Sequence, residues 1–191
     1  MASLRLFWAV PLPAEIREGI AAVQAAFLEF SLDVKWVEKQ NFHITVRFLG
    51  DTETAMIQRL VTAVEERLGS LRPFTVFLRG IGAFPSVRKP RILWVGIDAF
   101  EPLVLLHRLV EDALVNLGFP PDNKRFTPHI TIGRFRSARN AAVLEKKIGE
   151  IGNQEFGEVK VEELKLFASQ LYPTGPVYTP ISTVTFPGDS G

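Results

Sequence analysis

The stretch FHITVRFLG (residues 42–50) has a counterpart in PHITIGRF (residues 128–135), and the two histidines lie 86 positions apart. A second pair of similar segments, RLFWAV (residues 5–10) and RILWVG (residues 91–96), has the same offset. Two separate matches at one offset indicate an internal repeat. The chain is therefore expected to contain two copies of one structural unit.

The repeat predicts two lobes within one domain that covers residues 1–191. The copies span residues 1–86 and 87–172, and an additional strand at 177–186 follows them. In each copy, apolar residues indicate a strand, a helix, a strand, a helix and a strand, in that order. The predicted elements are 4–10, 13–29, 43–49, 54–68 and 74–82 in the first copy, and 91–97, 101–117, 129–135, 140–149 and 159–168 in the second.

This order of elements predicts an α+β fold in which a pseudo-two-fold axis relates the two lobes. Strands that alternate with helices are also compatible with a parallel sheet. A doubly wound nucleotide-binding fold needs a glycine-rich loop after a strand, and no such loop follows any of the predicted strands. The duplicated α+β unit is therefore the preferred interpretation.

The composition is typical of a globular protein. The 191 residues include no cysteine, which excludes thiol catalysis, thiolate zinc sites and disulfide bonds. No apolar run reaches the about 18 residues of a membrane span, and the apolar segment near residue 7 is too short for a secretory signal. The formal net charge is +1, so a basic surface for nucleic acid has to be local. We expect a cytoplasmic monomer without membrane contact.

Strand alternation places a histidine and a threonine of each copy on one face. In the first copy this face carries His43, Thr45 and Arg47, and the apolar core face carries Ile44, Val46 and Phe48. In the second copy the two faces carry His129 with Thr131, and Ile130 with Ile132. A pseudo-two-fold axis between the copies would bring both histidines and both threonines into one groove.

Two histidines in one groove suit acid–base chemistry at phosphorus. One imidazole accepts a proton while the other donates one, because histidine titrates near neutral pH. Hydroxyl and guanidinium groups donate hydrogen bonds to phosphate oxygens. The sequence has no His-x-His pair and no Asp/Glu cluster with ligand spacing, so we expect neither a metal ion nor a cofactor. The pattern favours in-line displacement at phosphorus without a metal.

The paired His-x-Thr segments resemble the signatures of the 2H phosphoesterase superfamily. The chain is most similar to the bacterial and archaeal RNA 2′,3′-cyclic phosphodiesterases, also called 2′-5′ RNA ligase-like proteins. The similarity extends to KWV (35–37), FLGD (48–51) and GAFPSVRKPRILWVG (82–96). The resemblance implies a LigT-like fold in which antiparallel sheets line a central groove and helices lie outside. It also implies hydrolysis of RNA 2′,3′-cyclic phosphate ends to 2′-phosphomonoesters, together with 2′-5′ RNA ligation, which is the reverse of the cleavage of a 2′-5′ linkage.

The resemblance also implies roles for individual residues. His43 matches the proton donor to the leaving O3′, and His129 matches the proton acceptor that activates water. Thr45 and Thr131 match the phosphate-binding threonines, and Arg134 matches a phosphate-binding arginine.

Arg134 conflicts with strict alternation, which places it on the core side of its strand. A bulge at Gly133, or a side chain that reaches round the strand end, would bring it back to the groove. Arg47 is a second candidate for phosphate binding, because alternation places it beside Thr45.

Further candidates lie outside the two motifs. Phe84 lies in a loop and is a candidate for stacking on the terminal base. The basic residues Arg88, Lys89 and Arg91, and also Lys124 and Arg125, are candidates for contacts to the RNA backbone. His107 has no counterpart in the first copy, so it is interpreted as structural, and the matching Trp8 and Trp94 are interpreted as core residues. Glu38 and Asp122 are the carboxylates considered as partners that orient the histidines.

The residues leave two alternatives open. The same catalytic pair would serve a phosphodiesterase for small cyclic nucleotides or 2′-5′ oligonucleotides. A non-catalytic module that binds RNA or nucleotides is a second alternative, although both histidines are present. The expected partner is an RNA with a 2′,3′-cyclic phosphate end or a small cyclic nucleotide.

Overall fold

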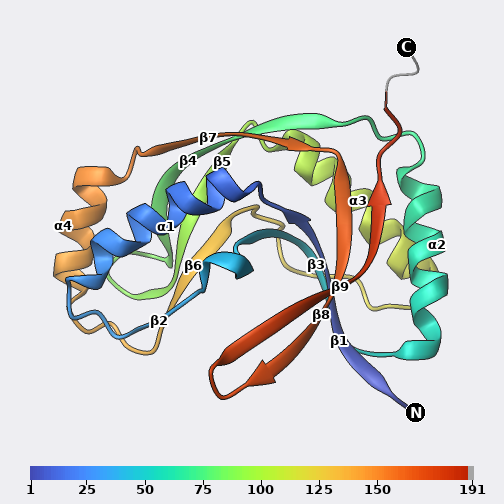
Figure 1. Ribbon diagram of the computed structural model, residues 1–191, viewed down its shortest axis with the longest axis horizontal. Helices are drawn as coiled ribbons and strands as arrows, with labels where there is room; N and C mark the ends of the chain where they lie inside the picture. The colour runs from blue at the N-terminus through green and yellow to red at the C-terminus, as the bar shows by residue number, and fades with distance from the viewer. Residues whose placement is uncertain (189–191) are drawn as a thin grey trace.

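The strands of the computed structural model, which describes residues 1–188, form two antiparallel sheets (Figure 1). The four-stranded sheet has the order β3-β1-β8-β9, and the five-stranded sheet has the order β2-β6-β5-β4-β7. The strands are β1 (Ser3–Pro11), β2 (Val34–Trp36), β3 (His43–Glu53), β4 (Phe74–Pro85), β5 (Pro90–Asp98), β6 (Ile130–Phe135), β7 (Glu155–Val161), β8 (Glu163–Tyr172) and β9 (Gly175–Thr185). The predicted α+β class with antiparallel sheets is confirmed.

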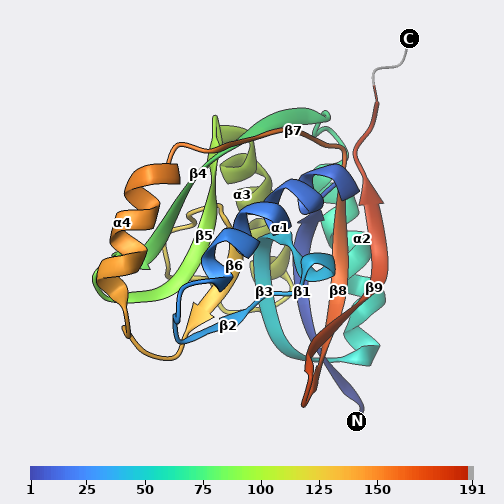
Figure 2. The same ribbon diagram turned by 60° about the vertical axis from the view of Figure 1, so that its left-hand side comes forward.

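Four α-helices lie at the outer sides of the sheets (Figures 1 and 2). They are α1 (Ala14–Leu28), α2 (Ile57–Leu68), α3 (Glu101–Asn116) and α4 (Ala141–Ile151), and two short 3₁₀ helices, η1 (Lys39–Asn41) and η2 (Thr54–Met56), flank β3. Helices α2 and α3 contact each other and strands of the four-stranded sheet, whereas α1 and α4 contact strands of the five-stranded sheet. No helix in residues 1–188 is long and apolar enough to cross a membrane.

Each of the two sheets contains strands from both sequence copies, residues 1–86 and 87–172. The last strand of the first copy, β4, pairs with β5 of the second copy. In return β8, from the second copy, pairs with β1 of the first. Helices are exchanged in the same way, since α1 contacts β7 and α3 contacts β3. Each lobe therefore depends on both halves of the chain.

The predicted strand over residues 159–168 is in fact two strands in different sheets. Strand β7 pairs with β4 and β8 pairs with β1, and Glu162 alone separates them. The buried residues of β7, Val159 and Val161, have odd numbers, whereas the buried residues Leu164 and Leu166 of β8 have even numbers. This change of phase marks the point where the chain passes from one sheet to the other, because alternation has a period of two.

Both histidine strands contain a bulge directly after the threonine. On β3, Thr45 pairs with Ala9 and Arg47 pairs with Trp8, so Val46 is an extra residue. On β6, Ile132 is the extra residue, because its neighbours pair with consecutive residues of β5. Both extra residues are buried, as expected for the core face. The bulge inverts the alternation of the residues that follow it, and on β3 a second bulge at Leu49 ends the inverted stretch.

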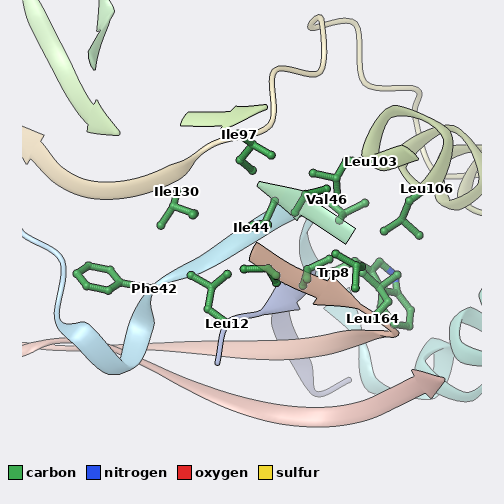
Figure 3. Close-up of a cluster of buried hydrophobic side chains, with 14 of the residues drawn as sticks. Trp8, Leu12, Phe42, Ile44, Val46, Ile97, Leu103, Leu106, Ile130 and Leu164 are labelled. Atoms are coloured by element: carbon green, nitrogen blue, oxygen red, sulfur yellow. The ribbon is translucent and has the colours of Figure 1, made fainter. Parts of the chain in front are cut away.

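The core confirms most of the predicted alternation. The side chains of Ile44, Val46 and Ile130 lie in the buried cluster that Figure 3 shows, together with Trp8 from β1. Ile132 is buried as well. Phe48 was expected in this core and is 59% exposed, so that expectation is wrong. The bulge at Val46 is the reason, because it turns Phe48 to the other face of the strand.

Trp8 and Trp94 are not equivalent in the structure, although their segments match in sequence. Ala9, not Trp8, pairs with the first threonine, whereas Trp94 pairs with the second. Trp8 is fully buried, while the half-buried Trp94 ring lies 5.2 Å from that of Phe84. The prediction of a core residue is therefore confirmed for Trp8 and wrong for Trp94.

Candidate active site

A cavity of about 490 Å³ is lined by residues from both sheets. Its wall contains His43 and Thr45 from β3, together with His129 and Thr131 at the start of β6. The structure thus brings both His-x-Thr pairs to one cavity. The remaining lining residues are Arg5, Lys35, Trp36, Val37, Glu38, Asn41, Phe48, Ile92, Arg134, Ser169, Leu171, Thr174, Gly175, Pro176 and Tyr178.

Each catalytic candidate is oriented by the carbonyl oxygen two residues before it. Nδ1 of His43 lies 2.7 Å from the carbonyl oxygen of Asn41, and Nδ1 of His129 lies 2.7 Å from that of Thr127. A carbonyl oxygen only accepts, so both Nδ1 atoms carry the hydrogen and donate it. In each neutral imidazole Nε2 is then the free base.

The carboxylates considered as orienting partners do not fill that role. Glu38 accepts a hydrogen bond from Gln40, and Asp122 accepts one from the backbone amide of Lys124. The sequence contains no side-chain signal for the real partners, because every residue has a backbone carbonyl group.

Further contacts hold each imidazole in place. Nε2 of His43 lies 2.7 Å from the hydroxyl oxygen of Thr45, which donates to the neutral ring and accepts from the protonated one. The Tyr178 ring meets His43 edge-on, with 5.5 Å between the centroids. Phe84 meets His129 in the same manner at 5.2 Å. Two aromatic rings from different strands therefore restrict the two imidazoles.

Both histidines have depressed pKa values. The pKa of His43 is lowered from 6.5 to about 4, chiefly by burial and also by the charges of Arg134 and His129, against the opposing hydrogen bond to Asn41. The pKa of His129 is also lowered, first by burial and then by Arg134, against the opposing hydrogen bond to Thr127. Burial raises the pKa of Tyr178, which stays neutral. Without a bound anion, both imidazoles are therefore neutral at pH 7.

The cavity wall is rich in cations. Arg134 lies opposite Lys35 on the paired strands β6 and β2, and Arg5 adds a third positive side chain. Among the described lining residues, Glu38 is the one carboxylate. Arg134 reaches this wall because the bulge at Ile132, one residue before the expected position, inverts the alternation. The arrangement suits an anion near the two imidazoles.

Arg47 lies outside the cavity, so the structure does not place it where alternation predicted. The bulge turns it toward α3, where its Nε atom lies 2.5 Å from Glu111. It also donates to the carbonyl oxygen of Pro120 at 2.7 Å, while Glu111 accepts from the backbone amide of Asp122 at 2.6 Å. The hydrogen bond from Arg47 holds the pKa of Glu111 low, although burial alone would raise it. Arg47 and Glu111 therefore hold residues 120–122, which precede His129 in the chain, against β3 and α3.

The other candidates also lie outside the cavity wall. Phe84 packs on His129 and Trp94, so it supports the histidine from behind. Arg88 is exposed and lies 3.3 Å from Glu145. Arg91 and Lys89 line a separate depression on the surface. His107 stacks on Phe126 with 4.3 Å between the ring centroids, away from the cavity.

The residues that sequence reasoning missed are Phe48, Lys35, Arg5 and Tyr178. Phe48 follows Thr45 by three positions, as Arg134 follows Thr131. A comparison of the two copies beyond the His-x-Thr pairs would have singled out Phe48. The other three come from separate strands that only the tertiary structure brings to the cavity. In residues 1–188 no three histidine or carboxylate side chains converge to hold a metal ion.

Comparisons with known proteins point to one family. A family model described as the 2′-5′ RNA ligase superfamily matches residues 7–171. The RNA 2′,3′-cyclic phosphodiesterase of Methanothermobacter thermautotrophicus is 35% identical over 176 residues, which cover 92% of this chain and 95% of that protein. The protein of the same name from Archaeoglobus fulgidus is 36% identical over 177 residues, covering 92% and 96%.

Solved structures share the whole fold. The crystal structure of TT0787 from Thermus thermophilus superimposes with a TM-score of 0.82 at 29% identity, over 97% of this chain and 99% of that one. That of E. coli LigT complexed with ATP gives a TM-score of 0.74 at 25% identity, with the same coverage.

Proposed function

The chain belongs to the 2′-5′ RNA ligase superfamily, and from this membership we propose that it hydrolyses RNA 2′,3′-cyclic phosphate ends to 2′-phosphomonoesters. The observation that carries the proposal is the pair of imidazoles in one cationic cavity, each with Nδ1 committed to a carbonyl oxygen. Relatives named RNA 2′,3′-cyclic phosphodiesterase, about 35% identical over nine-tenths of the chain, support the choice of substrate.

In this proposal His129 acts as the base and His43 as the acid. Nε2 of His129 accepts a proton from water, and the water oxygen forms a new bond to phosphorus. The P–O3′ bond breaks as Nε2–H of protonated His43 gives its proton to O3′. The phosphate stays on O2′. With a ribose 5′-hydroxyl in place of water, the same step forms a 2′-5′ linkage, and its reversal cleaves that linkage and restores the cyclic phosphate.

The cations and hydroxyl groups of the wall stabilise the charge on phosphorus. Arg134 and Lys35 lie next to each other on paired strands, and donors aimed at a developing charge are worth most in a site that excludes water. Thr45 and Thr131 supply hydroxyl donors from the two lobes. These side chains serve where other phosphoesterases use a metal ion. Phe48, 59% exposed at the cavity wall, offers an aromatic face for the terminal base.

The proposal is tested with a short RNA that carries a 2′,3′-cyclic phosphate, incubated in the presence of EDTA. We expect a product with its phosphate on O2′. A 3′-phosphate would contradict the direction of attack, and loss of activity with EDTA that added metal restores would contradict the metal-free mechanism. Turnover of cyclic mononucleotides without turnover of RNA would favour the small-nucleotide alternative.

Replacement of either histidine tests the assigned roles. His43→Ala and His129→Ala should each lower kcat by about 10²- to 10⁴-fold, the usual contribution of a positioned acid or base. An activated aryl phosphodiester needs no proton on its leaving group, so it should rescue His43→Ala and not His129→Ala. Rescue of His129→Ala instead would reverse the roles. His107→Phe, which keeps an aromatic ring on Phe126, is the matched control and should retain activity.

A further inference from the structure

A second depression lies at the ends of two strands that also build the catalytic cavity. It has a volume of about 450 Å³, and we call it the β5–β6 groove. Three of its lining residues are cations, and none of those described is a carboxylate. The lining residues are Lys89, Pro90, Arg91, Phe135, Arg136, Ser137 and Ala138.

The β5–β6 groove is a separate depression that begins within one residue of the catalytic cavity along β5 and β6. Ile92 and Arg134 line the cavity and pair directly across β5 and β6. The next residue on each strand, Arg91 before Ile92 and Phe135 after Arg134, already lines the groove. One strand residue spans about 3.3 Å, so less than about 10 Å of backbone separates Arg134 from Arg136. A chain held in the cavity therefore has a short path into the groove.

The cations of the groove are available for a ligand. Within residues 1–188, neither Lys89 nor Arg91 forms an ion pair through its side chain. Arg136 is 3.7 Å from Asp33 and its side chain is 65% exposed, so water screens this contact strongly. Asp33 also accepts a hydrogen bond from Ser137 of the groove at 2.7 Å, so one carboxylate lies beside the three cations. The whole chain carries a net charge of only +1, which makes this excess of cations a local feature.

The four-stranded sheet contributes exposed apolar side chains to the cavity wall, beside the cation Arg5 of the same sheet. These side chains include Phe48 and Leu171, which are 59% and 71% exposed. Exposed apolar side chains suit a base, whereas cations suit phosphate groups. A cyclic phosphate occupies the 3′ end of an RNA, so all further nucleotides extend in the 5′ direction. The cations of the β5–β6 groove match the phosphate groups of these further nucleotides.

We infer that the β5–β6 groove binds the backbone phosphates of the nucleotides on the 5′ side of the cyclic phosphate, so that the protein selects RNA chains over cyclic mononucleotides. This inference rests on the proposed function. Lys89, Arg91 and Arg136 neutralise phosphate groups in the groove, while the catalytic cavity holds the terminal nucleotide. The groove residues take no part in the reaction, so they affect the capture of long substrates and not the chemistry.

The experiment compares a cyclic mononucleotide with a six-nucleotide RNA that has the same cyclic end. The groove variant replaces Lys89, Arg91 and Arg136 by Gln, and its matched control replaces Arg59, Arg67 and Arg108, exposed cations of α2 and α3, by Gln. We expect the groove variant to lose about 10-fold or more in kcat/KM with the RNA and less than about 2-fold with the mononucleotide. Each lost phosphate contact should also weaken the salt dependence of log kcat/KM by about 0.7 in slope.

The outcomes separate the inference from the proposed function. Equal kcat/KM of the wild type for both substrates, or equal losses in the groove variant and its control, would overturn the inference while the activity stands. Absence of hydrolysis with either substrate would overturn the proposed function. In that case fluorescence anisotropy of a labelled RNA with a 2′-phosphate end decides, and equal affinity of wild type and groove variant would overturn the inference. Unchanged Tm values show that all variants are folded.

Discussion

Binding of a phosphate ester in the cavity should raise the pKa of His43. In the free protein that pKa is about 4 instead of 6.5, which corresponds to about 3 kcal/mol against the charged form. At pH 7 roughly one molecule in a thousand then carries the proton that His43 needs as an acid. A negative charge about 4 Å away contributes about 4 kcal/mol at an effective dielectric constant near 20. Such an anion is therefore sufficient to return the pKa of His43 to the neutral range.

The pH dependence of catalysis follows from this shift. The parameter kcat/KM reports the free protein, in which the proposed mechanism requires His43 to be protonated and His129 to be neutral. Since both pKa values are lowered, the optimum of kcat/KM should lie below pH 6.5. The optimum of kcat should lie at higher pH, because the bound substrate raises the pKa of the acid. The two imidazoles interact, so the apparent values belong to the pair.

The assay is an NMR titration of the histidine ring protons, with and without a nucleoside 2′-phosphate. His43→Gln identifies the resonance, and His107, outside the cavity, is the internal control whose pKa should not respond to the ligand. A pKa of His43 at or above 6.5 in the free protein would refute the reasoning. So would a pKa that does not rise with the ligand, or an optimum of kcat/KM above pH 7.

Three further predictions concern stability. The unfolded chain binds a proton at His43 below pH 6.5 and the folded protein only near pH 4, so the free energy of unfolding should fall as the pH drops from 6.5 to 4, by up to about 3 kcal/mol. Urea titrations at pH 7 and pH 4.5 measure this fall, and His43→Gln should show less of it. Arg47→Met leaves the Glu111 carboxylate, 16% exposed, without its partner, and should cost about 2–4 kcal/mol. Glu111→Gln combined with Arg47→Met should cost less than the sum of the single changes in the same urea assay. Gly82→Ala places a methyl group well inside van der Waals distance of the Trp94 ring and should lower stability by about 1–3 kcal/mol, and an unchanged Tm would contradict the close packing.

Local patterns in the sequence account for the catalytic pair. The two His-x-Thr segments share one offset, and their alternation predicted the buried faces of Ile44 and Ile130. These features depend on residues within a few positions of each other. These local features therefore do not depend on how the two strands are placed in the fold.

The two bulges explain why strict alternation predicted the wrong faces for the two arginines that follow the His-x-Thr segments. Strict alternation placed Arg47 in the groove and Arg134 in the core, and one extra residue on each strand reverses both. A bulge is a property of two paired strands, since it appears only when the partner's hydrogen bonds skip a residue. Val46 and Ile132 alone look like ordinary apolar strand residues.

The sequence by itself determined the repeat, the α+β class and the two histidines with their threonines. Only the tertiary structure decided which strands share a sheet, because the exchange of β4 and β8 depends on hydrogen bonds between segments far apart in the chain. It also decided how the histidines are held, through the carbonyl groups of Asn41 and Thr127. A backbone carbonyl is the same in every residue, so its role depends on where the folded chain places it.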